Sequence, residues 1–267
     1  METFLQIQNI SKSYFYSGKD NFILKNIEIK VSVGEITALI GANGTGKTTL
    51  FNIICGYEEA NKNKNSKISF KNEYNLLKYK PHQLEKLGIG RLFQEAHIFP
   101  KLSILENMLV ADENNFGDYP IHNLFKIRQS KIVEDERKEK ALSILKQTFG
   151  ESSIFVSNSN NLAENLSYGE QRLLGLVRLL MNDYQLLLLD EPTAGVNADI
   201  ISKIIEILQL FKAKGKTVFF IEHNMNFIKK IADNVLFLNN HSIEIQGEPE
   251  TVLNNEIVKK QYLGIIN

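Results

Sequence analysis

Cysteine, an excess of one charge and long apolar runs are scarce or absent in this 267-residue sequence. The single cysteine, Cys55, excludes an internal disulfide and a cysteine metal cluster, and it fits a reducing cytosol. Basic and acidic residues number 31 each, so the charge balance favours neither nucleic acid nor an anionic membrane as a partner. No N-terminal signal is visible, and apolar runs such as Leu186–Leu189 and Val218–Ile221 are too short to cross a bilayer. Work at a membrane would therefore need a partner.

The most informative stretch is the glycine-rich segment Gly41–Thr48. It lies between the apolar run Ile36–Ile40 and the helix-like Thr49–Cys55, which is the strand, loop and helix that a phosphate-binding loop requires. Backbone N–H groups and the positive end of the helix would hold the β-phosphate. Lys47 would reach the β- and γ-phosphates, and Thr48 would offer a hydroxyl to Mg²⁺. The residues of this segment that we expect to contact nucleotide are Gly41, Asn43, Gly44, Thr45, Gly46, Lys47, Thr48 and Thr49.

Two half-buried strands are predicted near the N-terminus, over Phe4–Ile10 and Phe22–Val31, joined by the polar turn Ser17–Asn21. Tyr14 and Tyr16 precede that turn and would share one strand face. An aromatic ring offers a flat surface on which a purine can stack. We assign adenine stacking to Tyr16, with Tyr14 as the alternative, and ordinary strand packing would be the simpler role for either ring.

Polar residues follow three further predicted strands, at the edge where ligands bind in open α/β sheets. Gln94 could reach Mg²⁺ or the attacking water, although a lone glutamine is usually a surface residue. Asp190 would hold the hydration shell of Mg²⁺, and Glu191 would polarise a water for attack on the γ-phosphate. His223 could contact the γ-phosphate, and a structural histidine is the alternative. The three strands are Ile89–Phe93, Leu186–Leu189 and Val218–Ile221.

The middle of the chain has a helical pattern from Ile104 to Phe149. Ser103 and Glu106 form a capping box at its start. Charged residues four positions apart are expected to pair on a solvated face. These pairs are Glu134 with Lys138 and Glu136 with Lys140.

A second cap is predicted in Leu166–Glu170, ahead of the apolar helix Leu173–Met181. Ser167 occupies the N-cap position, and Gly169 permits close approach of a bulky group to the start of the helix. An ordinary helix cap would have the same pattern, so this segment gains meaning only from the motifs around it.

Taken together, these motifs have the order and spacing of an ATP-binding cassette, and residues 4–264 resemble the ATPase subunits of ABC transporters. The resemblance makes Gly41–Thr48 the Walker A loop, Leu186–Asp190 the Walker B strand and Leu166–Glu170 the signature. It implies ATP and Mg²⁺ as cofactors. It also implies Glu191, His223 and Gln94 as catalytic residues, Thr48, Gln94 and Asp190 at the metal, and Ser167, Gly169 and Glu170 at the nucleotide of a second copy.

The fold implied by the resemblance is α/β, with a RecA-like P-loop core, an antiparallel β-subdomain and an inserted α-helical subdomain. Residues 1–267 would form one ABC ATPase domain. Its nucleotide-binding core would comprise residues 1–95 and 182–267, and its helical subdomain residues 96–181.

Within the family the chain is most similar to the ATPase subunits of branched-chain amino-acid importers. Leu166–Arg172, Asp190–Asn197 and Tyr262–Gly264 carry that similarity. The lipopolysaccharide-export ATPase is the alternative, favoured by Gln94–Phe99 and by His223-Asn224. Four residues depart from the commonest family pattern. They are Ala42 in place of proline, Tyr168 in place of glycine, Glu170 in place of glutamine and Asn197 in place of the D-loop aspartate.

The resemblance implies polytopic transmembrane permease subunits and a second ABC ATPase subunit, identical or not, as partners at the cytoplasmic face of the cell membrane. An importer would also use a solute-binding protein. Two other classes compete with this interpretation. A soluble ABC protein acting on nucleic acid or ribosomes usually carries paired cassettes, coiled coils or zinc cysteines, and a small-molecule kinase has no use for Leu166–Glu170. We therefore expect no nucleic-acid partner.

Overall fold

The structure is a computed structural model that describes residues 2–16, 18–95, 98–112 and 127–262, with the backbone alone for 127–131 and 262. Residues 96–97 and 263–264, which contribute to the family resemblance, lie outside this range. The chain forms two compact units. The first comprises Met1–Gln94, Tyr184–Ala194 and Leu208–Asn267, and the second Glu95–Asp183 and Gly195–Ile207.

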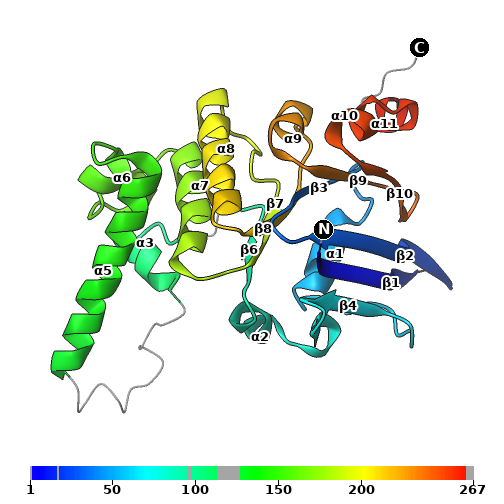
Figure 1. The fold of residues 1–267 in the computed structure, drawn as a ribbon, viewed down its shortest axis with the longest axis horizontal. Helices are drawn as coiled ribbons and strands as arrows, with labels where there is room; N and C mark the ends of the chain where they lie inside the picture. The colour runs from blue at the N-terminus through cyan, green and yellow to red at the C-terminus, as the bar shows by residue number, and fades with distance from the viewer. Residues whose placement is uncertain (1, 17, 96–97, 113–126, 263–267) are drawn as a thin grey trace. The chain divides into compact units, whose positions relative to one another are not determined.

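A six-stranded sheet forms the centre of the first unit, in the order β10-β9-β3-β8-β7-β6 (Figure 1). Neighbouring strands from β9 to β6 are parallel, and β10 pairs antiparallel with β9. Every residue of β3, β7 and β8 is buried, as expected for parallel strands covered on both faces. The carboxyl ends of these strands therefore meet at one edge. The strands are β3 (Ile36–Ile40), β6 (Ile89–Leu92), β7 (Leu186–Asp190), β8 (Thr217–Ile221), β9 (Asn234–Asn239) and β10 (Ser242–Gly247).

An antiparallel sheet in the order β2-β1-β4-β5 completes the β-structure of this unit. Its long hairpin pairs Tyr14 with Asn21 and Tyr16 with Lys19. Both strands run further than the sequence pattern predicts, β1 to Tyr16 and β2 from Lys19, so the tyrosines lie within a strand. The strands are β1 (Thr3–Tyr16), β2 (Lys19–Ser32), β4 (Lys67–Phe70) and β5 (Tyr74–Asn75).

One apolar cluster joins the two sheets and α1. Phe51 of α1 packs against Phe219 of β8, with ring centroids 5.0 Å apart. Leu5 and Phe70 enter the same cluster from the antiparallel sheet. The cluster fixes the start of α1 against the carboxyl edge of the parallel sheet. The helices of this unit are α1 (Lys47–Ile54), α2 (Pro81–Lys86), α9 (Met225–Ile231), α10 (Pro249–Asn254) and α11 (Glu256–Tyr262), with a 3₁₀ turn at Leu76–Lys78.

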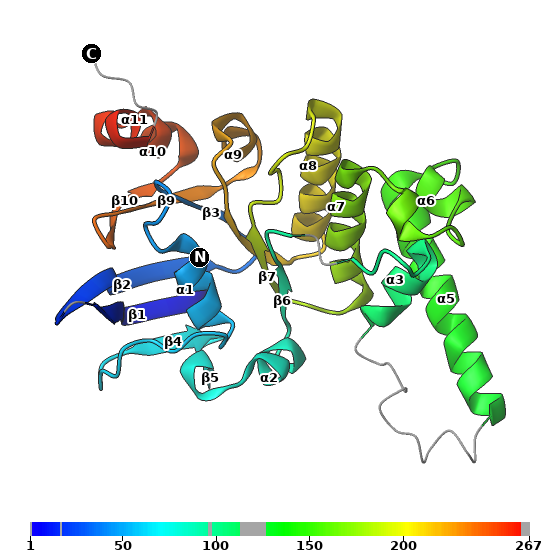
Figure 2. The same cartoon turned by 180° about the vertical axis from the view of Figure 1, so that it is seen from behind.

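The second unit is helical, and α3, α5, α6 and α7 gather in one group in both cartoon views (Figures 1 and 2). Phe149 and Phe155 stack with centroids 4.0 Å apart, tying α5 to α6. The predicted capping box of Ser103 and Glu106 is confirmed at the start of α3. The helices are α3 (Ile104–Val110), α5 (Ile127–Phe149), α6 (Ile154–Ser157), α7 (Tyr168–Val177) and α8 (Ala198–Ala213), with 3₁₀ turns at Ala163–Asn165 and Arg178–Met181. Helix α8 is divided between the units at Ile207.

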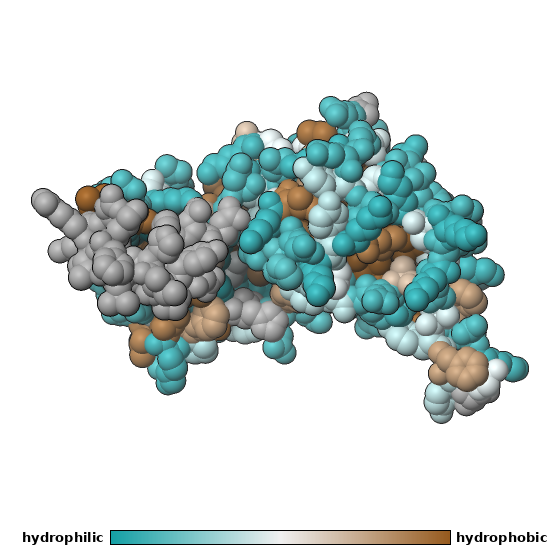
Figure 3. All heavy atoms as spheres, turned by 90° about the horizontal axis from the view of Figure 1, so that it is seen from below, coloured by the Kyte–Doolittle hydropathy of each residue, from teal (hydrophilic) through white to brown (hydrophobic). Residues whose placement is uncertain are grey.

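The face drawn in Figure 3 is mostly hydrophilic among the described residues, and its apolar residues form separate small patches. Across the described part of the chain, no helix combines the length and the apolar character that crossing a membrane requires. The apolar side chains instead fill the interior around the two sheets and between the helices.

Candidate functional site

The glycine-rich loop lies between β3 and α1, as predicted. Gly46 precedes the helix with a φ of 99°, no side chain caps the helix start, and its first turn has no acidic residue. The positive end of α1 can therefore face an anion without competition from a cap. Gly41 cannot carry a side chain, because a Cβ atom there would lie 2.3 Å from the carbonyl oxygen of Leu238. The loop thus depends on glycine at both positions.

Lys47 is the first residue of α1, and its side chain reaches back across this loop. Its Nζ donates hydrogen bonds to the carbonyl oxygens of Gly41 and Ala42 at 2.8 and 2.9 Å. The residue is only 6% exposed, and this burial lowers the pKa of Lys47, while the carboxylates of Glu191 and Asp190 act in the opposite direction. The ammonium group of Lys47 is thus a poorly solvated cation that could bind a phosphate strongly.

Asp190 ends β7 beside the start of α1 and is 2% exposed. Burial raises the pKa of this carboxyl; the guanidinium of Arg91 lowers it, and so does a hydrogen bond from Thr48. Arg91 Nη2 lies 3.7 Å from Asp190 Oδ2. The arginine side chain is itself buried and lies over the ring of Phe93, 4.4 Å from its centroid. A buried cation therefore backs the carboxylate at the predicted metal position.

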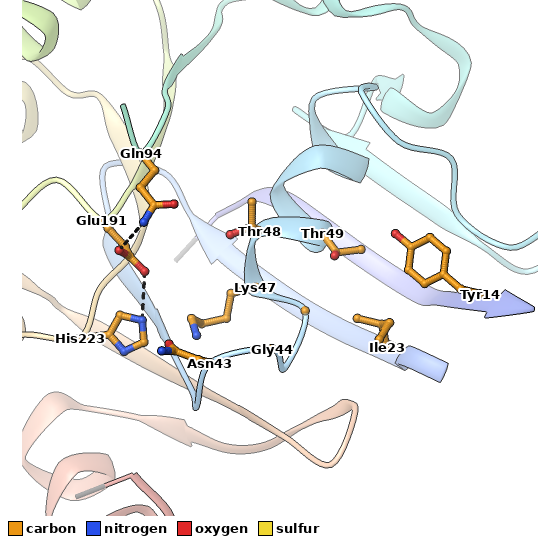
Figure 4. A pocket seen from close by; sticks show the side chains of 11 residues that line it. Tyr14, Ile23, Asn43, Gly44, Lys47, Thr48, Thr49, Gln94, Glu191 and His223 are labelled. Carbon is orange, nitrogen blue, oxygen red and sulfur yellow. Dashed lines mark hydrogen bonds and ion pairs between the residues drawn. The ribbon is translucent and has the colours of Figure 1, made fainter. Parts of the chain in front are cut away.

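Glu191 lies between two of the predicted catalytic side chains (Figure 4). Gln94 donates from Nε2 to Glu191 Oε2 at 3.1 Å, and His223 Nε2 lies 3.1 Å from Glu191 Oε1. The backbone of Glu191 is in the left-handed region, with a φ of 47°, which is unusual for a non-glycine residue. Three strand ends, those of β6, β7 and β8, thus bring Gln94, Glu191 and His223 together.

A cavity of about 530 Å³ connects this trio with the glycine-rich loop. Its volume lies within the range typical of small-molecule sites. The cavity belongs entirely to the first unit. It is lined by Tyr14, Ile23, Asn43, Gly44, Gly46, Lys47, Thr48, Thr49, Gln94, Glu191 and His223.

At the far end of this cavity stands Tyr14, the alternative to Tyr16 (Figure 4). Its hydroxyl donates to Glu58, which raises the pKa of the phenol, and Lys12 Nζ lies 5.0 Å from the ring centroid. Tyr16 is not among the lining residues and is 74% exposed. The arrangement therefore favours Tyr14 for contact with a base.

The predicted signature residues lie in the second unit and are not among those that line the cavity. Ser167 is the N-cap of α7, as predicted. The backbone N and the Oγ of Ser167 both donate hydrogen bonds to Glu170 Oε2, at 2.7 Å. Gly169 packs against Ile200, where a Cβ atom would lie 2.7 Å from the isoleucine side chain. Ser167 and Glu170 thus form a capping box, which the sequence analysis missed although the Ser-x-x-Glu spacing indicates it.

The residues at the predicted metal position fit Mg²⁺. In the described parts of the chain, no cluster of three or more His, Cys, Asp and Glu side chains is arranged to hold a metal. Magnesium instead prefers a few oxygen ligands and keeps several waters. Thr48, Gln94 and Asp190 supply hydroxyl, amide and carboxylate oxygens. Because Gln94 directs its nitrogen to Glu191, its oxygen is the atom that would serve a metal.

A family model described as "ABC transporter" matches residues 24–194, which is more than half of the chain. The chain belongs to the ABC transporter family. It is an ATPase of that family, and the predicted α/β cassette fold is confirmed by solved structures. An ATP-binding cassette of an ABC transporter in its ADP conformation is 30% identical with a TM-score of 0.80, covering 99% of this chain and 100% of that one. A nucleotide-free cassette has 30% identity and a TM-score of 0.78, with 98% and 100% covered.

Among curated ABC proteins, the chain is 34% identical to the probable branched-chain amino acid transport ATP-binding protein LivG of Archaeoglobus fulgidus, over 97% of this chain and 95% of the relative. The high-affinity LivG protein of Escherichia coli strain K12 is 29% identical, over 90% of this chain and 91% of the relative. Both matches extend well beyond the nucleotide motifs.

Two residues of the cassette's site escaped the sequence analysis. Arg91 is a charged residue within an otherwise apolar strand, three positions before Gln94, and that interruption is a signal that could have been followed. Glu222 immediately precedes His223 and is 3% exposed. A carboxylate directly after a fully buried strand is the same signal that predicts Asp190 as a site residue.

Proposed function

We propose that this chain powers import of a branched-chain amino acid or a similar solute. The observation that carries the proposal is the 34% identity to the LivG protein of Archaeoglobus fulgidus over 97% of the chain. The cassette would bind polytopic permease subunits at the cytoplasmic face of the membrane and respond to a solute-binding protein. We further propose that residues 1–267 act as one cassette, with the core and helical segments that the sequence predicts.

The site supports the following roles in hydrolysis. Lys47 and the N–H groups of the loop hold the phosphates, and Tyr14 stacks on adenine. Glu191 accepts a proton from the attacking water, His223 contacts the γ-phosphate and orients Glu191, and Gln94 positions the water. When bound at Thr48, Gln94 and Asp190, Mg²⁺ would neutralise charge on the phosphates. The 3.1 Å contacts of Glu191 with Gln94 and His223 support this division of work.

A second copy or a related cassette would complete the site. Ser167, Gly169 and the positive end of α7 would approach the γ-phosphate bound by the other copy's Lys47. ATP would then hold two composite sites together, and loss of phosphate would release them. Transport follows from the different affinities of the closed and open states for the permease.

Substitutions of Lys47 and Glu191 test the proposed site. Lys47→Ala should abolish tight ATP binding, because the phosphates lose their cation, and unchanged affinity in an equilibrium titration would refute the loop's role.

Glu191→Gln should keep ATP binding and slow phosphate release by about 10²–10⁴-fold, the scale of a lost general base. A variant that turns over at the wild-type rate would remove Glu191 from the mechanism.

Reconstitution tests the proposed transport. The cassette, co-purified with its permease and placed in liposomes, should hydrolyse ATP faster when a solute-binding protein loaded with leucine, isoleucine or valine is added. The same solutes should accumulate on the side where the solute-binding protein is absent. Stimulation by lipopolysaccharide instead would favour the export alternative, and failure to co-purify with any polytopic protein would contradict both.

A further inference from the structure

Glu222 occupies an unusual position between the parallel sheet and the catalytic histidine. It directly follows β8, precedes His223, and is 3% exposed. A buried carboxylate is costly unless hydrogen bonds compensate it. Its partners therefore indicate why the site contains it.

The two oxygens of Glu222 divide between two segments. Oε1 accepts from the backbone N and the Oγ1 of Thr193, at 2.7 and 2.5 Å. Oε2 accepts from the backbone N–H groups of His223 and Asn224, at 2.8 and 3.1 Å. One carboxylate thus joins the segment that follows β7 to the segment that follows β8.

The segment after β7 has a conformation that needs such support. Glu191 has a φ of 47°, its N–H donates to the carbonyl oxygen of Ile221 at 2.9 Å, and its own carbonyl accepts from Ala194 N at 3.1 Å. A glutamate backbone in the left-handed region is strained, and it is stable only where the surrounding structure holds it in place. Thr193 lies inside this turn, so Glu222 holds the turn from within.

We propose that Glu222 is a positioning residue that sets the geometry of the Glu191–His223 pair. It fixes the backbone that carries each partner and thereby holds Glu191 Oε1 and His223 Nε2 3.1 Å apart. A carboxylate suits this task because it only accepts hydrogen bonds and offers about four lone-pair sites, enough for the donors of Thr193, His223 and Asn224. A glutamine at position 222 would direct its amide N–H₂ group toward the donors of Thr193 or toward those of His223 and Asn224, and this group cannot accept hydrogen bonds from them. This role rests on the proposed function of Glu191 and His223.

The test is a double-mutant cycle of Glu222→Gln with His223→Ala. Glu222→Gln should lower kcat about 10- to 100-fold, the scale of a small misplacement of reacting groups, and leave the Kd for a non-hydrolysable ATP analogue within about twofold. In the His223→Ala background the same substitution should change kcat less than about threefold, because the pair no longer exists. An equal loss in both backgrounds, or a loss of analogue binding, would overturn the proposal.

A milder variant covers the case in which Glu222→Gln does not fold. Thr193→Val removes the hydroxyl donor to Glu222 Oε1 and places a methyl group where that hydroxyl lies 2.5 Å from the carboxylate. It should lower kcat about two- to fivefold in the wild-type background and by less in the His223→Ala background, since Glu222 loses one of the hydrogen bonds that position the pair. Equal effects of Thr193→Val in both backgrounds would contradict the inference. If His223→Ala and Glu191→Gln themselves leave turnover unchanged, the proposed function fails independently of Glu222.

Discussion

The two tyrosines of the first hairpin differ in what surrounds them. Tyr14 lines the cavity and is tied by its hydroxyl to Glu58, whereas Tyr16 is 74% exposed near the hairpin turn. The sequence predicts a five-residue turn at Ser17–Asn21, whereas the observed strands extend further and pair Tyr16 with Lys19. Aromatic character and face could be predicted, but the length of the pairing could not, because the strand ends lack apolar alternation.

Tyr14→Ala should weaken ATP binding about 5- to 150-fold, since base stacking contributes about 1–3 kcal/mol. Tyr16→Ala, the matched control on the same strand face, should change the Kd less than about twofold. Equilibrium titration with a fluorescent ATP analogue measures both. A larger effect at Tyr16 would restore the assignment that the sequence favoured.

Cys55 gives the chain a pH dependence that can be isolated. Burial raises the pKa of its thiol from the ordinary 9.0 to about 11, despite the opposing effect of Arg91. Because the folded pKa is the higher one, the stabilisation is complete below pH 9 and is lost as the pH rises through about 11. At about 1.4 kcal/mol per pKa unit, the loss is on the order of 2–3 kcal/mol.

Denaturant unfolding at several pH values between 8 and 11 tests this expectation. The free energy of unfolding of the wild type minus that of Cys55→Ala should fall across this window by about 2–3 kcal/mol. The subtraction removes the contributions of other groups, including Lys47, whose lowered pKa acts in the opposite direction. A pH-independent difference would show that the thiol is not shielded in the folded state.

At the scale of elements, strand predictions succeeded where every residue is buried. The apolar runs of β3, β7 and β8 agree with the observed strands to within a residue. Charged helix faces were less predictable. Lys138 pairs with Glu134 as expected, but Lys140 donates to the carbonyl oxygen of Met181 at 2.6 Å. Local spacing indicates which pairs can form, and tertiary neighbours decide which do.

The cap of α3 should stabilise the helical unit measurably. Ser103 Oγ accepts from the backbone N of Glu106 at 3.1 Å, and the Glu106 carboxylate accepts from the backbone N of Ser103 at 2.7 Å. Ser103→Ala should lower the free energy of unfolding by about 1 kcal/mol, as for other N-cap losses. Ser143→Ala, at an exposed position within α5, is the matched control and should be nearly neutral. Equal effects in thermal or urea unfolding would show that the cap contributes nothing specific.

At the scale of the whole molecule, the site arises from strand order more than from any one motif. Four strand ends, those of β3, β6, β7 and β8, supply the loop, Gln94, the Asp190-Glu191 pair and His223 to one edge of a sheet. These residues could be predicted because polar residues after apolar runs are conspicuous in the sequence. Arg91 and Glu222 could not be assigned roles, because their importance comes from contacts with Asp190 and Thr193 on neighbouring segments.

The composite sites proposed above would require a head-to-tail contact, which cross-linking can detect. Cys55 is the single cysteine and is buried, so Cys55→Ser gives a thiol-free background into which exposed thiols can be introduced. We expect Asn43→Cys in one copy and Ser167→Cys in another, both also carrying Glu191→Gln, to be joined by a short bis-maleimide only when Mg-ATP is present. The reason is that ATP on the loop of one copy would bring α7 of the other to its γ-phosphate.

The matched control pairs Asn43→Cys with Ser143→Cys, which is also exposed but lies within α5 rather than at the start of α7. That mixture should give no ATP-dependent cross-linked product. The Asn43→Cys variant alone and the Ser167→Cys variant alone should also give none. Product that forms without ATP, or equally with Ser143→Cys, would mean that collisions rather than a composite site bring the thiols together. A single copy would then have to carry out hydrolysis with the residues of its own cavity, and Ser167 would keep only its role as the cap of α7.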